Sequence, residues 1–220
     1  MKTAPLLKIC GITSREGAEA AIDAGATWLG FNFHPPSPRY IAPEHARSIV
    51  DQLPLGIAAV GVFVNRPHPA EVQSIMDLAG MQIAQLHGDE DAAYCREVGS
   101  ARVIKAFRAG PDFVPSQVLA YPVGWVLLDG YHPHLYGGTG RQVDWSVAAE
   151  VARLAPLFLA GGLSPETVGE AIRQVHPFAL DVNSGVECAP GIKDAARLAQ
   201  LREQIDLTVA SAQEPTWENS

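Results

Sequence analysis

The chain has few cysteines and no long apolar run, and both shortages exclude classes of protein. Three cysteines, at positions 10, 95 and 188, are too few for a disulfide framework and indicate a reducing cytosol. No stretch approaches the roughly 18 uninterrupted apolar residues of a membrane span. The N-terminus also lacks the apolar core and cleavage site of a secretory signal. We therefore expect a cytoplasmic protein that has no membrane partner.

Basic residues are also scarce. Lysine and arginine total 16 against 24 acidic residues, so the formal net charge is −8, and the basic residues form no run. Nucleic-acid binding draws much of its affinity from cations that neutralise phosphates, and we expect no nucleic-acid partner. A small phosphorylated ligand remains compatible with this charge, because backbone N–H groups at a helix N-terminus can hold one phosphate.

What the chain does contain is an alternation of short β-rich runs and helical patterns along its 220 residues. Several of the β-rich runs are almost wholly apolar, as strands buried on both faces should be. The predicted strands are Leu6–Cys10, Thr27–Phe33, Ala58–Val64, Gln82–Leu86, Arg102–Phe107, Gly124–Asp129, Leu157–Ala160 and Phe178–Val182.

Helix signals lie between these runs. Thr13-Ser14-Arg15-Glu16 reads as a capping box, in which Thr13 caps the first helix. Gly80 follows an apolar helical stripe and predicts a left-handed C-terminal cap. Ser164-Pro165-Glu166 predicts an N-cap followed by proline at the first helical position. The weakest helix is expected between the fifth and sixth strands, where three prolines leave little room: Pro111, Pro115 and Pro122.

Eight strand–helix units of about 27 residues each predict an α/β fold, a compact single (β/α)₈ barrel. We expect the barrel to span residues 1–209 and a disordered tail to span 210–220. An open doubly wound sheet is the rival, but it usually carries G-x-G-x-x-G after the first strand. Cys10-Gly11-Ile12-Thr13 does not match that pattern.

Polar and glycine-rich residues gather where the predicted strands end. In a parallel barrel the carboxyl ends of the strands form one rim, and active sites lie on that rim. The residues singled out there are Cys10, Arg39, Gln85, His87, Asp129, Gly161, Gly162, Asp181, Asn183, Ser184 and Gly185.

The last two loops carry the most specific pattern. Gly161-Gly162-Leu163-Ser164-Pro165 allows close approach of the backbone to a ligand and then opens a helix. Asn183-Ser184-Gly185-Val186 can start a one-turn extra helix. Together they match the phosphate site that barrels build after strands seven and eight. The alternative interpretation is two tight turns that need glycine.

Two further residues each leave two interpretations open, and one segment suggests a loop over the site. Asp129 ends a buried strand, so it either faces a reaction site or caps the next loop. Arg39, in a proline-stiffened loop, either binds an anion through its guanidinium or lies exposed on the surface. The segment Tyr136-Gly137-Gly138-Thr139-Gly140 is typical of a mobile loop over a site.

The histidines raise the question of a metal. His132 and His134 form a His-x-His pair near His87, and such a pair can bind zinc. No carboxylate or cysteine spacing completes a ligand set, and we therefore expect no metal site. Cys95 is most simply a helix residue packed on the barrel. We assign no role to Cys188.

Taken together in this order, the motifs resemble those of the phosphoribosylanthranilate isomerase family of tryptophan biosynthesis. The resemblance runs from Lys8 to about Gly191. It is carried by Lys8-Ile9-Cys10-Gly11-Ile12-Thr13, Ser37-Pro38-Arg39-Tyr40, Val60-Gly61-Val62-Phe63-Val64-Asn65, Gln85-Leu86-His87-Gly88, Leu127-Leu128-Asp129, Gly137-Gly138-Thr139-Gly140, Asp144-Trp145, Ala160-Gly161-Gly162-Leu163 and Asp181-Val182-Asn183-Ser184-Gly185-Val186-Glu187.

The resemblance implies an Amadori rearrangement of an N-phosphoribosyl anthranilate, with no metal or organic cofactor. It makes Asp129 the general acid that opens the sugar ring and Cys10 the general base that removes the C2′ proton. It implies Arg39 near the anthranilate moiety. The remaining pocket residues it implies are Gln85, His87 and Asp181, with Gly161, Gly162, Asn183, Ser184 and Gly185 at the phosphate. Asn183 stands where the family often has serine.

Several alternatives stay open at this point. Another phosphosugar barrel, such as an epimerase or an indoleglycerol-phosphate-type lyase, would need a different acid–base set. Lys105 lies in the fifth strand without the partners that such a lyase would need. A non-catalytic phosphometabolite-binding protein would not need the thiol. Lys8 shares a strand face with Cys10 and either reaches the thiol or fills a polar layer. The protein is expected to be a monomer or homodimer.

Overall fold

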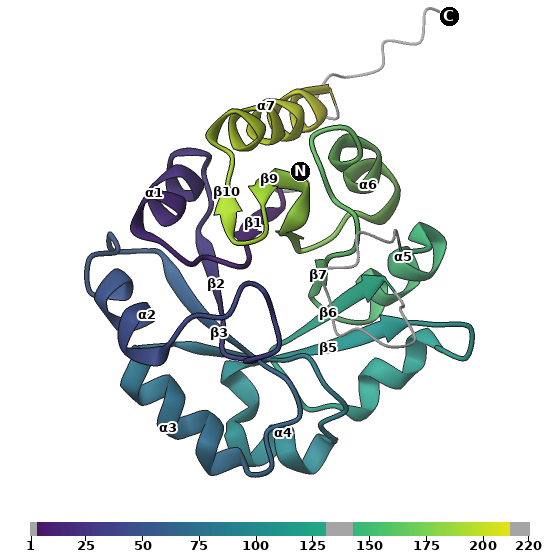
Figure 1. The fold of residues 1–220 in the computed structure, drawn as a ribbon. Coiled ribbons are helices and arrows are strands. Elements are labelled where there is room, and N and C mark those ends of the chain that lie inside the picture. Colours follow the sequence, from purple (N-terminus) through teal and green to yellow (C-terminus); the bar gives the residue numbers. More distant parts are fainter. Residues whose placement is uncertain (1–3, 131–142, 212–220) are drawn as a thin grey trace, which may run out of the picture.

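Eight parallel strands form a closed barrel in the computed structural model, which describes residues 4–130 and 143–211 (Figure 1). Each strand pairs with its neighbour in sequence, and the first and last strands pair with each other to close the barrel. The barrel strands are β1 (Leu6–Ile9), β2 (Trp28–Asn32), β3 (Ala58–Phe63), β4 (Ile83–Leu86), β5 (Val103–Ala109), β6 (Trp125–Gly130), β7 (Leu157–Leu159) and β8 (Ala179–Val182).

Helices surround the strands on the outside, and α7 lies between the first and sixth helices (Figure 1). The α-helices are α1 (Arg15–Asp23), α2 (Pro43–Val50), α3 (Pro69–Ala79), α4 (Ala92–Val98), α5 (Trp145–Leu154), α6 (Val168–Val175) and α7 (Ala195–Ser211). Three 3₁₀ segments accompany them: η1 (Ser100–Arg102), η2 (Pro115–Ala120) and η3 (Ser184–Val186).

The closed barrel confirms the predicted fold and excludes the open sheet. Every predicted strand overlaps an observed one, with ends that differ by one or two residues. The proline-rich stretch between β5 and β6 forms only the 3₁₀ segment η2, because proline cannot donate a helical hydrogen bond. No helix in the described part of the chain is long and apolar enough to cross a membrane.

Three local predictions need correction. Ser14, not Thr13, caps α1 by accepting a hydrogen bond from the Gly17 amide, while the Thr13 hydroxyl donates to the carbonyl of Gly191. Helix α6 begins at Val168, and Pro165 lies in the turn before it. Helix α7 extends to Ser211, so the expected boundary at 209/210 falls two residues early. Residues 212–220 lie outside the described residues.

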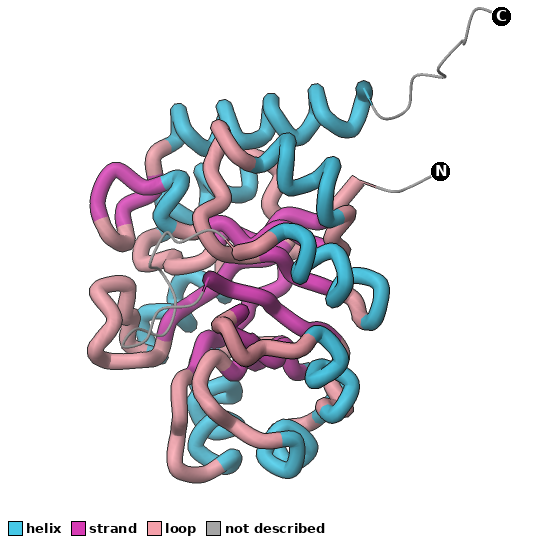
Figure 2. Tube along the Cα trace, turned by 90° about the vertical axis from the view of Figure 1, so that its right-hand side faces the viewer, coloured by secondary structure: helices cyan, strands magenta, loops and turns pink. Residues whose placement is uncertain are grey.

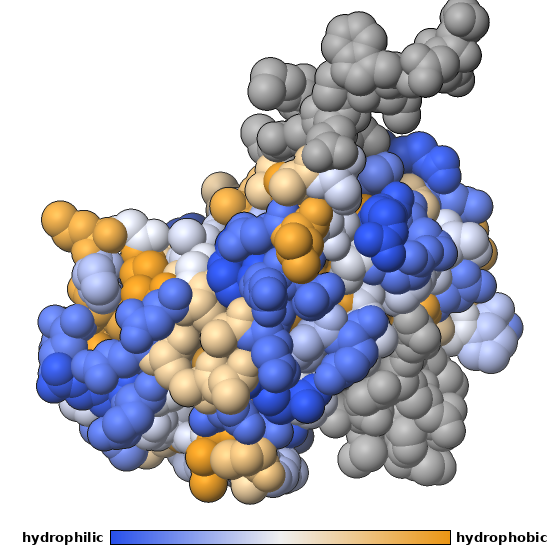
Figure 3. Space-filling model, turned by 90° about the horizontal axis from the view of Figure 1, so that it is seen from above, coloured by the Kyte–Doolittle hydropathy of each residue, from blue (hydrophilic) through white to orange (hydrophobic). Residues whose placement is uncertain are grey.

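Alternation along the strands separates two cores. On β1, Leu7 and Ile9 face outward and belong to the large core between barrel and helices. The barrel interior has its own apolar cluster: Val60, Ile83, Ile104, Ala106, Leu127, Phe158, Ala160 and Ala179. Lys8, which alternates with Leu7 and Ile9, faces that interior. Figure 2 shows the strands enclosed by helices and loops, and the face in Figure 3 is mainly hydrophilic.

A two-stranded antiparallel hairpin follows the barrel and was not predicted. Its strands, β9 (Glu187–Ala189) and β10 (Ile192–Lys193), are joined through Gly191, which adopts a left-handed φ of 82°. Lys193 pairs in register with Glu187. The hairpin therefore carries two charged residues back toward the end of β8.

Candidate active site

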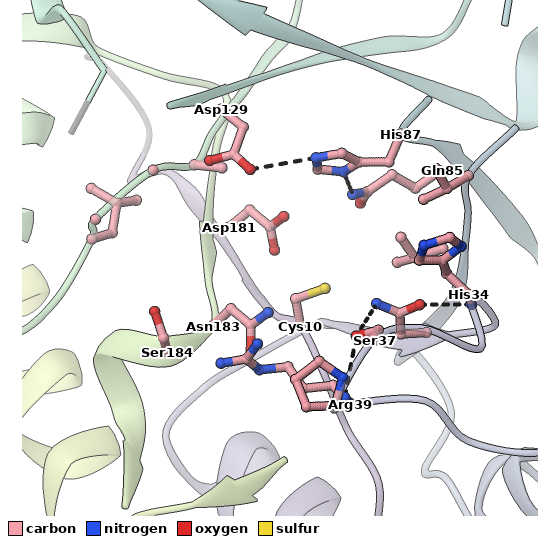
Figure 4. A pocket seen from close by; sticks show the side chains of 18 of the residues that line it. Cys10, His34, Ser37, Arg39, Gln85, His87, Asp129, Asp181, Asn183 and Ser184 are labelled. Carbon is pink, nitrogen blue, oxygen red and sulfur yellow. Dashed lines mark hydrogen bonds and ion pairs between the residues drawn. The ribbon is translucent and has the colours of Figure 1, made fainter. Parts of the chain in front are cut away.

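A cavity of about 270 Å³, lined by both polar and apolar side chains, opens where the barrel strands end (Figure 4). Ten of the eleven residues predicted for the site line it, and the eleventh, Gly185, packs directly behind it. The lining residues are Cys10, Asn32, His34, Pro36, Ser37, Pro38, Arg39, Val62, Val64, Gln85, His87, Asp129, Ala160, Gly161, Gly162, Leu163, Asp181, Asn183 and Ser184.

Cys10 directly follows β1 and is almost fully buried beneath the cavity. Its thiol lies against Gly30 of β2, where a Cβ would come within 2.8 Å of the sulfur. Burial raises the pKa of the Cys10 thiol above its ordinary value, since a thiolate is poorly solvated there; the charge of Lys8 acts in the opposite direction. The free protein therefore favours the neutral thiol.

Lys8 is fully buried and pairs with Asp181 of the adjacent β8. Its Nζ donates to Asp181 Oδ1 at 2.8 Å, as expected for residues in register on neighbouring strands. Burial lowers the pKa of Lys8, but the charge of Asp181 and the hydrogen bond to it act in the opposite direction, and the net shift is upward. Burial also leaves the pKa of Asp181 raised. Lys8 thus lies inside the barrel, paired with Asp181 and close enough to the Cys10 thiol to lower its pKa.

Gln85, His87 and Asp129 form a chain along one side of the cavity (Figure 4). The Gln85 amide Nε2 lies 2.7 Å from His87 Nδ1, and His87 Nε2 lies 3.4 Å from Asp129 Oδ2. The Gln85 amide donates to Nδ1, which assigns the ring proton to Nε2 on the side of Asp129. Among the described residues, neither of the buried atoms His87 Nε2 and Gln85 Oε1 has a partner at hydrogen-bond geometry, and His87 Nε2 makes only the 3.4 Å ion-pair contact with Asp129.

Both interpretations of Asp129 are correct: its carboxylate accepts a hydrogen bond from the loop that follows and also faces the cavity. Its Oδ1 accepts a hydrogen bond from the Gly130 amide at 2.8 Å, while Oδ2 faces His87 across the cavity wall. The side chain is buried and lines the cavity. Asp129 therefore lies next to the last residue of β6 and points one carboxylate oxygen into the site.

The two glycine-rich loops lie together as predicted. Gly161 and Gly162 adopt left-handed φ angles of 81° and 70°, a conformation that favours glycine. The extra 3₁₀ turn η3 begins at Ser184, and a Cβ on Gly185 would come within 2.0 Å of the Leu163 carbonyl oxygen. The close packing brings both loops to one end of the cavity.

Arg39 is not the exposed surface arginine that the sequence left possible. It is 9% exposed and forms a two-pronged ion pair with Glu187 of the hairpin. Its Nη2 donates to Oε2 at 2.7 Å, and its Nε lies 3.1 Å from both carboxylate oxygens. The guanidinium is therefore held in one orientation at the cavity wall.

The other residues considered in the sequence either lie away from the cavity or lie outside the described residues. Cys95 is fully buried in α4 against the barrel, as expected. Lys105 points outward from β5, where it pairs with Glu90 at 2.8 Å. His132, His134 and the segment 136–140 lie outside the described residues. Within residues 4–130 and 143–211, no three histidine, cysteine or acidic side chains are placed to hold a metal ion.

Sequence reasoning missed five polar residues of this region: Asn32, His34 and Ser37 of the cavity wall, and Glu187 and Lys193 of the hairpin. Asn32 ends β2 two positions after Gly30, so alternation alone could have placed it inward. Glu187 and Lys193 gave no such signal, because the hairpin that carries them has strands of only three and two residues.

Fold and cavity together define a (β/α)₈-barrel enzyme with its site at the carboxyl ends of the strands. A family model described as N-(5'-phosphoribosyl)anthranilate (PRA) isomerase matches residues 7–204. An N-(5'-phosphoribosyl)anthranilate isomerase of Geobacter sulfurreducens is 49% identical over 195 residues, which cover 89% of this chain and 95% of the relative.

Solved structures give the same result. The phosphoribosyl anthranilate isomerase of Thermus thermophilus superposes with a TM-score of 0.84 at 40% identity, over 94% of this chain and all of that one. A second such isomerase, in complex with reduced 1-(o-carboxyphenylamino)-1-deoxyribulose 5-phosphate, has a TM-score of 0.80 at 36% identity, over 92% and 98%. The chain belongs to the N-(5'-phosphoribosyl)anthranilate isomerase family, whose members are enzymes of tryptophan biosynthesis.

Proposed function

We propose that the protein converts N-(5-phosphoribosyl)anthranilate to 1-(2-carboxyphenylamino)-1-deoxyribulose 5-phosphate, with Asp129 as general acid and Cys10 as general base. Asp129 donates a proton to the ring oxygen as the C1′–O bond breaks, and the anilino nitrogen lone pair forms an iminium. The Cys10 thiolate takes the C2′ proton, and the released electron pair forms the enolamine. Tautomerisation moves a proton from the C2′ hydroxyl to C1′, so reactant and product are isomers.

The observation that carries this proposal is the shared position of Asp129 and Cys10 on the cavity wall. Asp129 lies near the end of β6 and Cys10 directly follows β1, and these two strands are three positions apart around the barrel. Each side chain extends from its strand end into the same small volume. An acid and a base so separated can act on neighbouring atoms of one sugar.

The base must act as a thiolate, although burial raises the pKa of Cys10 in the free protein. Opening of the ring supplies the compensation, because the iminium is a positive charge next to the thiol. Lys8, on the same strand face, adds a fixed charge that also lowers the thiol pKa. Charge nearby favours the thiolate, as it does at reactive cysteines generally.

The substrate's two anionic groups have candidate partners at different places in the cavity. The glycine-rich loops at Gly161, Gly162, Ser184 and Gly185, with Asn183, are suited to the phosphate. Arg39 is suited to the anthranilate carboxylate, since a guanidinium binds carboxylates through paired hydrogen bonds. Gln85, His87 and Asp181 remain for the sugar. A relative binds a phosphorylated carboxyphenylamino sugar, which agrees with this assignment.

The competing barrel reactions have less support. Ring closure to an indole would need a lysine that lines the barrel mouth. Lys105 points away from the mouth and pairs with Glu90, and Lys8 is fully buried in its pair with Asp181 and does not line the cavity. A pure binding protein would have no use for a thiol beside a carboxylic acid. A cytoplasmic location, the absence of a metal or organic cofactor, and a monomeric or homodimeric state stay predictions.

The test is a continuous assay of anthranilate-type fluorescence, with the substrate generated in situ from anthranilate and a phosphoribosyl donor. The proposal predicts enzyme-dependent loss of fluorescence as the aminoketose forms. Unchanged fluorescence at micromolar enzyme would contradict the proposal and favour a non-catalytic phosphometabolite-binding protein.

A further inference from the structure

The hairpin after the barrel carries two charged side chains that the mechanism does not use. Glu187 of β9 and Lys193 of β10 have side chains that are 3% and 0% exposed, although hairpins of this size usually present their charges to water. Lys193 Nζ lies 2.8 Å from Glu187 Oε1. Burial of such an ion pair costs desolvation free energy, and we therefore asked what the pair does for the site.

Glu187 is shared between two cations. Arg39 engages it through Nε and Nη2, and Lys193 engages Oε1 from the other side. Burial raises the pKa of Glu187, but the hydrogen bond from Arg39 and the charge of Lys193 outweigh burial, and the net pKa is lowered. The Glu187 carboxylate is therefore held in its ionised form between two basic side chains.

Lys193 also reaches the phosphate loop. Its Nζ donates to Asn183 Oδ1 at 3.1 Å, and Asn183 directly precedes the 3₁₀ turn η3. One buried ammonium thus joins the carboxylate that holds Arg39 to the loop that we assign to the phosphate.

The cluster lies directly above the strand that carries the thiol. A Cβ on Gly11 would come within 2.7 Å of both Arg39 Cδ and Asn183 Oδ1. Gly11, next to Cys10, therefore leaves the room in which the arginine and the asparagine approach each other.

We propose that Glu187 and Lys193 are positioning residues for the two anionic groups of the substrate, an inference that rests on the proposed function. Glu187 holds one edge of the Arg39 guanidinium and so aims the arginine at the aromatic carboxylate. Lys193 offsets the charge of Glu187, which would otherwise cancel that of Arg39, and orients Asn183 for the phosphate.

The experiment compares two substrates, the anthranilate compound and its aniline counterpart, which lacks the carboxylate. Glu187→Gln should raise KM for the anthranilate substrate about tenfold or more, since charge-assisted hydrogen bonds are at stake. It should leave kcat, and both constants for the aniline substrate, within about threefold of wild type. Lys193→Gln should raise KM for both substrates, because the phosphate is common to them.

The matched control is Glu170→Gln, which removes an exposed glutamate that pairs with Arg173 and does not line the cavity, and it should change neither constant. If Glu187→Gln does not fold, Glu187→Asp keeps the charge but withdraws it from Arg39 and tests the same expectation. Equal changes in KM for both substrates in the Glu187 variant would overturn the inference. An inactive wild-type protein would instead overturn the proposed function, so the two failures are distinguishable.

Discussion

The thiol of Cys10 occupies the space that a side chain on Gly30 would need. A Cβ on Gly30 would lie 2.8 Å from the Cys10 sulfur and 3.1 Å from its Cα. Gly30 faces the barrel interior from β2, while Cys10 follows the neighbouring β1. The glycine thus fixes where the proposed base can stand, without touching substrate itself.

Gly30→Ala should therefore displace the thiol and lower turnover by about 10²-fold, the scale that a misplacement near 1 Å can cost. The measurement is kcat in the fluorescence assay, with circular dichroism to show that the barrel remains folded. A Gly30→Ala enzyme with turnover within a few-fold of wild type would contradict this role of the glycine.

Lys8→Met should destabilise the protein by about 3–5 kcal/mol, because it leaves the buried Asp181 carboxylate without its partner. Equilibrium unfolding in urea measures the change. The double variant Lys8→Met/Asp181→Asn should recover part of the loss, since no unpaired charge is then buried. A double variant no more stable than Lys8→Met alone would speak against the ion pair as the cause.

The Cys10 thiol should titrate above its ordinary pKa of 9.0 in the free protein, because burial disfavours the thiolate. The rate of alkylation by iodoacetamide should thus rise with pH and level off only beyond that value. Lys8→Met should move the inflection higher still, since it removes a charge that lowers the pKa. Measurements belong on a Cys188→Ser background, because Cys188 is exposed. An inflection below 9.0 would contradict the expected direction.

Activity should survive exhaustive dialysis against EDTA. The proposed acid and base are both protein side chains, and the reaction needs no change of oxidation state by an external agent. The fluorescence assay before and after dialysis provides the measurement. Loss of activity that zinc restores would instead point to His132 and His134 as metal ligands.

Much of the barrel could be predicted because its signals are local. Strands buried on both faces are continuous apolar runs, and strict alternation shows that Lys8 and Cys10 share one face. The order of the elements then brings residues such as Cys10, Asp129 and Asp181 to a single rim. These predictions needed only the two-residue periodicity of the strands and the order of the elements along the chain.

The details that could not be predicted depend on contacts between distant residues. Thr13 and Ser14 are equally able to cap a helix, and Ser14 does so because the Gly191 carbonyl takes the Thr13 hydroxyl. Arg39 is buried because Glu187 lies opposite it, 148 positions away in sequence. The sequence around Thr13 does not indicate its contact with Gly191, and the sequence around Arg39 does not indicate its contact with Glu187.

Replacement of the proposed base and acid tests the central claim most directly. Cys10→Ser and Asp129→Asn should each reduce turnover by at least about 10²-fold, the usual contribution of a general acid or base. Cys188→Ser and Asp77→Asn, which change exposed residues of the same types, should leave turnover unchanged. If either Cys10→Ser or Asp129→Asn retains turnover within a few-fold of wild type, that residue has no place in the mechanism.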